Sequence, residues 1–134
     1  MKRVFVDTNV ILDVLLQNEG FWQDSLKIFK LVELGQLTAY VSASSMTDIF
    51  YVAAKRLSTP VARQAIEKLL DLFNIVAVDG DDLRNTLLIP IADYEDALQA
   101  HLAKKAGVDT LITRDIEVFS NIGIEVLSPA EFTV

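Results

Sequence analysis

Short apolar runs alternate with longer segments of helical period along most of this 134-residue chain. Apolar residues that recur every three or four positions predict amphipathic helices, and short apolar runs bounded by polar residues predict strands. Runs of the second kind lie at residues 4–6, 39–41, 75–78, 110–113 and 124–127. Strands that alternate with helices predict an α/β fold with three α/β/α layers and a central, mostly parallel, five-stranded sheet.

Capping residues indicate where several helices begin and end. Thr59 is the expected N-cap of a helix with Pro60 at its first position. Asp93 is expected to cap a helix that runs to residue 105 and ends before Gly107. The other helices are expected near residues 10–15, 22–34, 44–57 and 82–88.

Composition limits the class of protein. The length fits a single domain, expected to span residues 1–134, and the apolar fraction of 51% supports a real core. The absence of cysteine excludes a disulfide scaffold, a thiol nucleophile and a Cys-rich zinc site, and it fits a cytoplasmic location. No apolar run approaches the roughly 18–20 residues of a membrane span, so a soluble protein is expected.

The charge balance is unusual for a protein that binds nucleic acid. Twelve Lys and Arg residues face nineteen Asp and Glu residues, which gives a net charge of −7. This is the wrong sign for an ordinary nucleic-acid binder. Either the partner is not a polyanion, or bound metal ions neutralise several of the carboxylates.

Four aspartates fall where an α/β fold places its ligands. In open parallel sheets, ligands gather beyond the carboxyl ends of the strands. Asp7 and Asp115 follow the first and fourth predicted strands, while Asp48 and Asp96 lie in the first turns of predicted helices. We therefore expect these four acids, from four distant segments, to converge on one cleft.

Simpler roles exist for the same residues. Asp48 and Asp96 each follow a Ser or Asp by three residues, a spacing that also suits helix capping. Asp115 would serve equally well as the N-cap of a short helix. Asp7 is harder to explain in this way, because an acid that ends a buried strand needs a partner. The only histidine, His101, is expected to face away from Asp96 and to have a packing role.

A cluster of aspartates without cysteine or a suitable histidine favours hard divalent cations. Mg²⁺ prefers oxygen ligands and binds through carboxylates, water and substrate phosphates. Crowded carboxylates raise one another's pKa unless cations lie between them. Two such ions can activate water for attack on a phosphodiester, and they would change the net charge from −7 to −7 + 4 = −3.

Four segments of this chain resemble PIN-domain nucleases, in the right order along nearly its whole length. They are residues 4–13 (VFVDTNVILD), 93–98 (DYEDAL), 111–115 (LITRD) with Phe119 following, and 128–132 (SPAEF). The resemblance implies a compact α/β/α endoribonuclease that depends on Mg²⁺ or Mn²⁺ and hydrolyses RNA. It also implies membership among VapC-type toxins, which pair with an antitoxin protein and form homodimers.

The resemblance assigns the site residue by residue. The acids would be Asp7, Asp48, Asp96 and Asp115, with Asn9 and Thr113 as supporting polar residues and Asp93 as a further acid on the rim. Two positions depart from the family pattern. Asp48 stands where Glu is common, and Val118, with Glu117 beside it, stands where the family often has a second acid.

Arg114 is the best candidate for a contact with substrate phosphate, because its guanidinium is a planar and permanently charged fork. The basic pairs at residues 55–56 and 104–105 are explained by the dipoles of the helices that they end. Phe21 and Trp22 could stack on a base, although packing in the core or in a dimer is the favoured interpretation.

Two competing functions stay open on the sequence alone. One is a PIN-like module that binds proteins without catalysis, which the acidic surface and the short Asp48 favour. The other is a phosphotransfer enzyme or receiver domain with Asp7 as phospho-acceptor. Asn9 and the segment Thr113–Arg114–Asp115 disfavour the second alternative, because such proteins usually carry an aspartate and a lysine, respectively, at those places.

Overall fold

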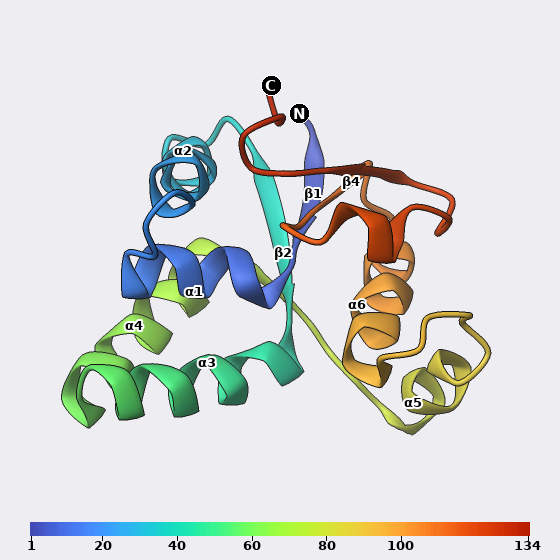
Figure 1. The fold of residues 1–134 in the computed structure, drawn as a ribbon, viewed down its shortest axis with the longest axis horizontal. Helices are drawn as coiled ribbons and strands as arrows, with labels where there is room; N and C mark the ends of the chain where they lie inside the picture. The colour runs from blue at the N-terminus through green and yellow to red at the C-terminus, as the bar shows by residue number, and fades with distance from the viewer.

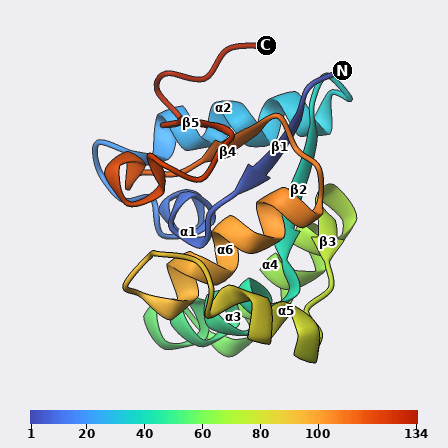
Figure 2. The same cartoon turned by 90° about the vertical axis from the view of Figure 1, so that its right-hand side faces the viewer.

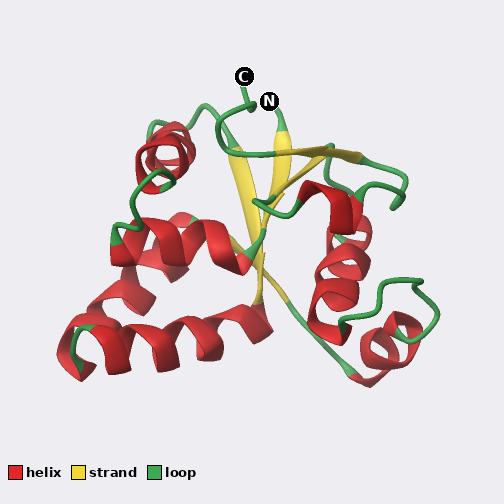
Figure 3. Ribbon diagram, viewed as in Figure 1, coloured by secondary structure: helices red, strands yellow, loops and turns green.

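A central five-stranded sheet organises the computed structural model, which describes residues 1–134 (Figures 1 and 3). Its strands are β1 (Arg3–Val6), β2 (Thr38–Ser42), β3 (Asn74–Val76), β4 (Thr110–Ile112) and β5 (Glu125–Leu127). The helices are α1 (Thr8–Leu16), α2 (Trp22–Glu33), α3 (Ala43–Arg56), α4 (Thr59–Leu72), α5 (Gly80–Thr86), α6 (Tyr94–Lys105) and the 3₁₀ helix η1 (Ile116–Phe119). The predicted α/β fold is confirmed, and every strand pair is parallel.

The sheet separates two hydrophobic cores. Successive side chains of a strand point to opposite faces, and β1 follows this rule. Val4 and Val6 join the core that helices α1 to α4 cover, whereas Phe5 joins the core under α6 and η1. Figure 1 shows these two groups of helices on opposite sides of the strands. The three predicted layers are therefore present.

The strand order places a ligand crevice between β1 and β4. The order is β3-β2-β1-β4-β5. Strands β2 and β3 therefore lie on one side of β1, and β4 and β5 lie on the other side. The carboxyl ends at such a reversal form the usual ligand crevice of open α/β sheets. Val6 pairs with Ile112, and the next residues along each strand, Asp7 and Thr113, consequently meet at this point.

Some element boundaries differ from those expected. The N-cap of α4 is Ser58, whose hydroxyl accepts a hydrogen bond from the Val61 amide at 3.2 Å; Thr59 is already helical. Ser and Thr are both good caps, and Pro60 fits either assignment, so the spacing alone could not decide. Helix α5 begins two residues early, at Gly80, because Asp79 and Asp82 form a reciprocal capping box.

The start of α6 is as expected. The Asp93 side chain accepts a hydrogen bond from the Asp96 amide at 3.0 Å and so caps the helix. The helix ends at Lys105, and Gly107 follows with a φ of +67°, a left-handed conformation that glycine adopts without strain. None of the helices combines the length and the apolar character that crossing a membrane requires.

The corrected cap of α4 can be tested by substitution. We expect Ser58→Ala to lower the free energy of unfolding by about 1 kcal/mol, because it removes a side-chain acceptor from the first turn of the helix. Thr59→Ala is the matched control and should change it by much less. Urea unfolding of the two variants checks this, and a larger loss in Thr59→Ala would restore the assignment made from the sequence.

Candidate active site

Asp7 is a buried carboxylate at the carboxyl end of β1. It is 4% exposed, and its amide donates a hydrogen bond to the Ile112 carbonyl at 2.9 Å. The Thr113 hydroxyl donates to Asp7 Oδ2 at 2.8 Å and accepts from the Asp115 amide at 3.0 Å. Thr113, which is itself fully buried, therefore connects the ends of β1 and β4 and orients both aspartates.

Burial makes Asp7 unusually hard to ionise. The pKa of Asp7 is raised from 3.8 to about 6, mainly by burial and to a smaller extent by the nearby carboxylates of Asp96 and Asp115. Hydrogen bonds from Thr113 and from the Thr8 amide act in the opposite direction but do not cancel the effect. Asp7 therefore gains its full negative charge only near neutral pH, unless a cation lies beside it.

Asp96 and Asp115 complete an electrostatically coupled trio with Asp7. Asp96 lies in the first turn of α6, and its pKa is raised by burial and then by Asp93 and Asp115. Asp115 follows β4 and is exposed, and its Oδ2 accepts a hydrogen bond from Asn9 Nδ2 at 3.2 Å. Figure 2 shows that α1 and α6 flank the end of β1.

Asp48 lies at the margin of this trio. It is exposed on α3, and it raises the pKa of Glu95, after the larger effect of burial and together with Asp93 and Asp96. Asp48 is not among the groups that shift the pKa of Asp7 or Asp96. Sequence reasoning missed Glu95, although its place between Asp93 and Asp96 in the segment DYED was a usable signal.

The oxygen donors suit a hard divalent cation, although they are not arranged as a finished coordination shell. No three acidic or imidazole side chains lie close enough together to form a metal cluster. The trio nevertheless consists of carboxylates that repel one another, which a cation would relieve. Asn9 Oδ1 is also buried without a hydrogen-bond partner. Because an unpaired buried acceptor is costly, this oxygen is a further available ligand.

A buried polar network lies beneath the site. Thr8 and Ser45 are joined through their hydroxyls at 2.7 Å, and Gln99 Nε2 donates to the Ser45 hydroxyl at 3.0 Å. These three residues belong to α1, α3 and α6, the helices that also carry Asn9, Asp48 and Asp96. Since buried hydrogen bonds fix distances and angles, the network sets how these helices approach one another.

Arg114 lies beside Asp115 but extends toward α1 and α2. Its Nε is 3.0 Å from Oδ2 of the fully buried Asp13, and its guanidinium stacks over the Phe21 ring at 4.3 Å. Phe21 is 44% exposed. Of the two packing roles expected for Phe21, the one in the core is wrong, because its ring lies at the surface against the arginine, while packing in a dimer stays a prediction.

His101 belongs to a separate polar cluster, as its expected orientation away from Asp96 predicts. Its Nε2 lies 2.9 Å from Oδ1 of Asp82, whose other oxygen accepts from Lys105 Nζ at 2.7 Å. The hydrogen bond from Lys105 is the largest cause that lowers the pKa of Asp82. This cluster joins α5 to α6 and has no part in the acidic trio.

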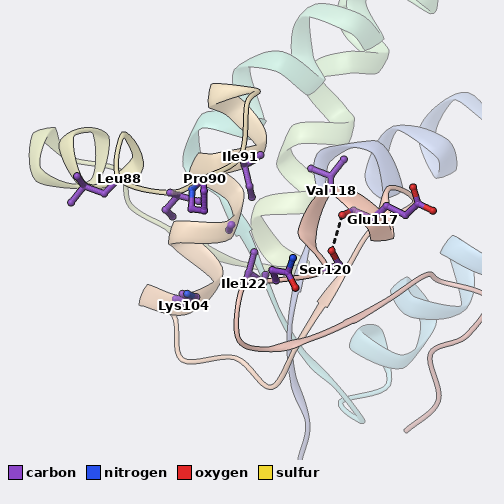
Figure 4. Close-up of a pocket in the computed structure, with 11 residues that line it drawn as sticks. Leu88, Pro90, Ile91, Lys104, Glu117, Val118, Ser120 and Ile122 are labelled. Carbon is purple, nitrogen blue, oxygen red and sulfur yellow. Dashed lines mark hydrogen bonds between the residues drawn. The ribbon is translucent and has the colours of Figure 1, made fainter.

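A cavity of about 390 Å³ opens between α6, η1 and the segment that follows α5 (Figure 4). Leu88, Pro90 and Ile91 form much of its wall, and its charged residues are Lys104 and Glu117. No member of the acidic trio lines it. It is therefore distinct from the candidate active site.

Comparison with known proteins gives a family and a fold. A family model described as "PIN domain" matches residues 3–117. Ribonuclease VapC1 from Aquifex aeolicus (strain VF5) is 26% identical over 136 residues, which cover 98% of this chain and 93% of that protein.

Solved structures share the architecture at low sequence identity. Mycobacterium tuberculosis VapC20, described as a Sarcin-Ricin loop cleaving toxin, has a TM-score of 0.71 and 15% identity, covering 90% of this chain and 95% of its own. A toxin-antitoxin complex from Klebsiella pneumoniae contains a chain with a TM-score of 0.71 and 20% identity, covering 96% of this chain and 99% of its own. These two similarities establish the fold.

The raised pKa of Asp7 predicts how stability depends on pH. The folded protein holds the Asp7 proton more tightly than the unfolded chain does. The protonated carboxyl group therefore adds to the free energy of unfolding below pH 4, and this stabilisation is lost as the pH rises through about 6. Relative to Asp7→Asn, which does not titrate, the wild type should lose roughly 3 kcal/mol of unfolding free energy over that interval. Urea unfolding in EDTA from pH 4 to pH 7.5 measures the difference. Parallel pH profiles for the two proteins would contradict the assignment.

Proposed function

The chain belongs to the PIN-domain family, and from this membership we propose that it is a divalent-metal-dependent endoribonuclease that acts as the toxin of a toxin–antitoxin pair. The coupled trio of Asp7, Asp96 and Asp115 at the sheet reversal is the observation that carries the proposal. The similarity to ribonuclease VapC1, which extends over nearly the whole chain, supports RNA as the substrate.

Asp7, Asp96 and Asp115 would hold Mg²⁺ or Mn²⁺, with Asn9 as a neutral oxygen donor. Asp48 would act at the margin together with Glu95, in keeping with its exposed position and short side chain. When bound, the ion supplies an activated water and neutralises charge at the phosphate. Other side chains of the protein position the carboxylates that would hold the ion.

Thr113, Asn9 and Asp93 each hold one acid of the trio in place. Thr113 donates to Oδ2 of Asp7, and Asn9 restrains Asp115 through one carboxylate oxygen. Asp93 caps α6 through the Asp96 amide and so fixes the backbone that carries this acid. Such supporting contacts determine the direction in which ligand oxygens point.

The proposal also includes an antitoxin partner and a homodimer. The protein would act in the cytoplasm, where it would encounter both RNA and the antitoxin. The structural similarity to a toxin-antitoxin complex supports the partner. Leu87 and Leu88, which are 73% and 82% exposed after α5, are apolar groups suited to a protein contact. Sedimentation equilibrium of the purified chain, which should give the mass of two copies, tests the homodimer directly.

One observation favours the competing candidate, a PIN-like module without catalysis. The acids do not form a finished metal cluster, and such a module would have no need to bind a cation. Titration with Mn²⁺ separates the two functions, because only the nuclease requires binding that involves Asp7.

RNA cleavage is the direct test of the proposed nuclease. Wild-type protein with Mn²⁺ should cleave single-stranded or structured RNA, and EDTA should abolish the activity. Asp7→Asn and Asp96→Asn should each lower the rate at least about 100-fold, because each removes a charge that holds the ion. Asp81→Asn is the matched control, since this carboxylate is 84% exposed on α5. Cleavage that persists in both site variants and in EDTA would refute the proposal.

The hydroxyl of Thr113 offers a test of metal binding that does not depend on activity. Thr113→Val should weaken Mn²⁺ binding roughly tenfold in calorimetry, because supporting residues of this kind typically contribute 10–100-fold in metal affinity. Thr110→Val is the control, since this buried hydroxyl on the same strand donates to Glu125 at 2.7 Å. Equal affinities in the two variants would show that Thr113 has no specific role.

A further inference from the structure

Three consecutive residues after β4 each contact the N-terminal segment of the chain. Thr113 binds Asp7, Asp115 binds Asn9, and Arg114 pairs with Asp13. Asn9 and Asp13 are one helical turn apart, so they lie on the same face of α1. The first two contacts build the acidic trio, while the third has no role in it.

Asp13 and Arg114 form a close ion pair, in which Asp13 Oδ2 accepts no aligned hydrogen bond. Asp13 is 0% exposed, and its Oδ1 accepts from Asn18 Nδ2 at 2.8 Å while its Oδ2 lies 3.0 Å from Arg114 Nε. A buried carboxylate is stable only when it is paired in this way. Because Asp13 engages Nε, the two terminal Nη nitrogens of Arg114, which donate to no protein acceptor, are left for another group.

Arg114 also lines a small pocket. It has a volume of about 210 Å³ and is lined by residues 20–21, 24–25 and 128–130 together with Arg114. Ser25 on its wall is fully buried, and the Ser25 hydroxyl has no hydrogen-bond partner. Unpartnered buried hydroxyls are rare and costly.

The surroundings of the pocket favour an anion. The guanidinium carbon of Arg114 lies 4.3 Å from the centroid of the Phe21 ring, and a planar guanidinium can donate two parallel hydrogen bonds to a phosphate. The one carboxylate on the wall, Asp24, is paired with Lys27 at 3.1 Å. Arg114 follows β4 and Ser128 follows β5, so the pocket opens at the same edge of the sheet as Asp7.

We propose that this pocket is a subsite for a phosphodiester group of single-stranded RNA that flanks the cleaved bond. Arg114 binds the phosphate, and Asp13 is a positioning residue that orients the guanidinium. The volume suits one phosphodiester unit, being below the roughly 300–1,000 Å³ of sites for larger ligands. This inference rests on the proposed ribonuclease function, which supplies the RNA.

The dependence of RNA binding on salt tests the phosphate contact. The probe is a fluorescein-labelled single-stranded RNA 12-mer, measured by anisotropy in EDTA at several KCl concentrations. The double variant Asp13→Asn/Arg114→Gln keeps the net charge of the protein and leaves no buried charge unpaired. It should bind roughly tenfold more weakly, and the slope of log affinity against log salt should become shallower by about 0.7, the value for one phosphate on a single strand.

Arg84→Gln is the matched control, because Arg84 is an exposed arginine paired with an aspartate on α5. It should leave both affinity and slope unchanged. Thermal melts followed by circular dichroism verify that each variant is folded. A folded double variant with the wild-type slope and affinity would overturn the subsite and leave Arg114 with a purely structural ion pair.

Cleavage kinetics separate the positioning role of Asp13 from a structural one. Asp13→Asn keeps the arginine, so the salt slope should be retained while the KM for RNA rises several-fold and kcat changes little. An unchanged KM would contradict the positioning role. Since binding is measured in EDTA, absence of cleavage by the wild type would refute the nuclease without affecting the binding result. Cleavage with unaltered binding by the double variant would refute only the subsite.

Discussion

The hydrogen bond between Thr113 and the buried Asp7 is the constraint on which the site depends. It joins the carboxyl ends of β1 and β4 at the point where the strand order reverses. These two strands lie side by side although more than one hundred residues separate them in the chain. Thr113 also binds the Asp115 amide, so one hydroxyl orients two of the three coupled acids. The cost of burying Asp7 appears in its raised pKa, and a divalent cation would remove that cost.

A protein with a net charge of −7 repels RNA overall, so action on RNA would require positive charge concentrated near the site. The acids that would bind cations are coupled electrostatically, although they do not form a finished metal cluster. Arg114 follows β4 at the same edge of the sheet and contacts Asp13 and Phe21, and in the proposed subsite it would bind a phosphate. Orientation of a few groups thus compensates for an unfavourable overall charge.

Much of the fold was accessible from the pattern of residues. The alternation of strands and helices predicted the sheet, the layers and the cap of α6 at Asp93. Boundaries were less accessible, because Ser58 and Thr59 are chemically similar caps and only the hydrogen bond to Val61 distinguishes them. Similarly, Glu95 could not be separated from its acidic neighbours until Asp48 was placed across from it.

The sequence by itself determined which residue types stand at the ends of the strands and the starts of the helices, because local periodicity and capping depend on near neighbours. It thereby selected four acids for one edge of the sheet, namely Asp7, Asp48, Asp96 and Asp115. Only the tertiary structure decided that Asp48 faces Glu95, that Arg114 turns back to Asp13, and that His101 joins Asp82. These pairings join segments far apart in the chain, and their distances follow from how the helices pack on the sheet.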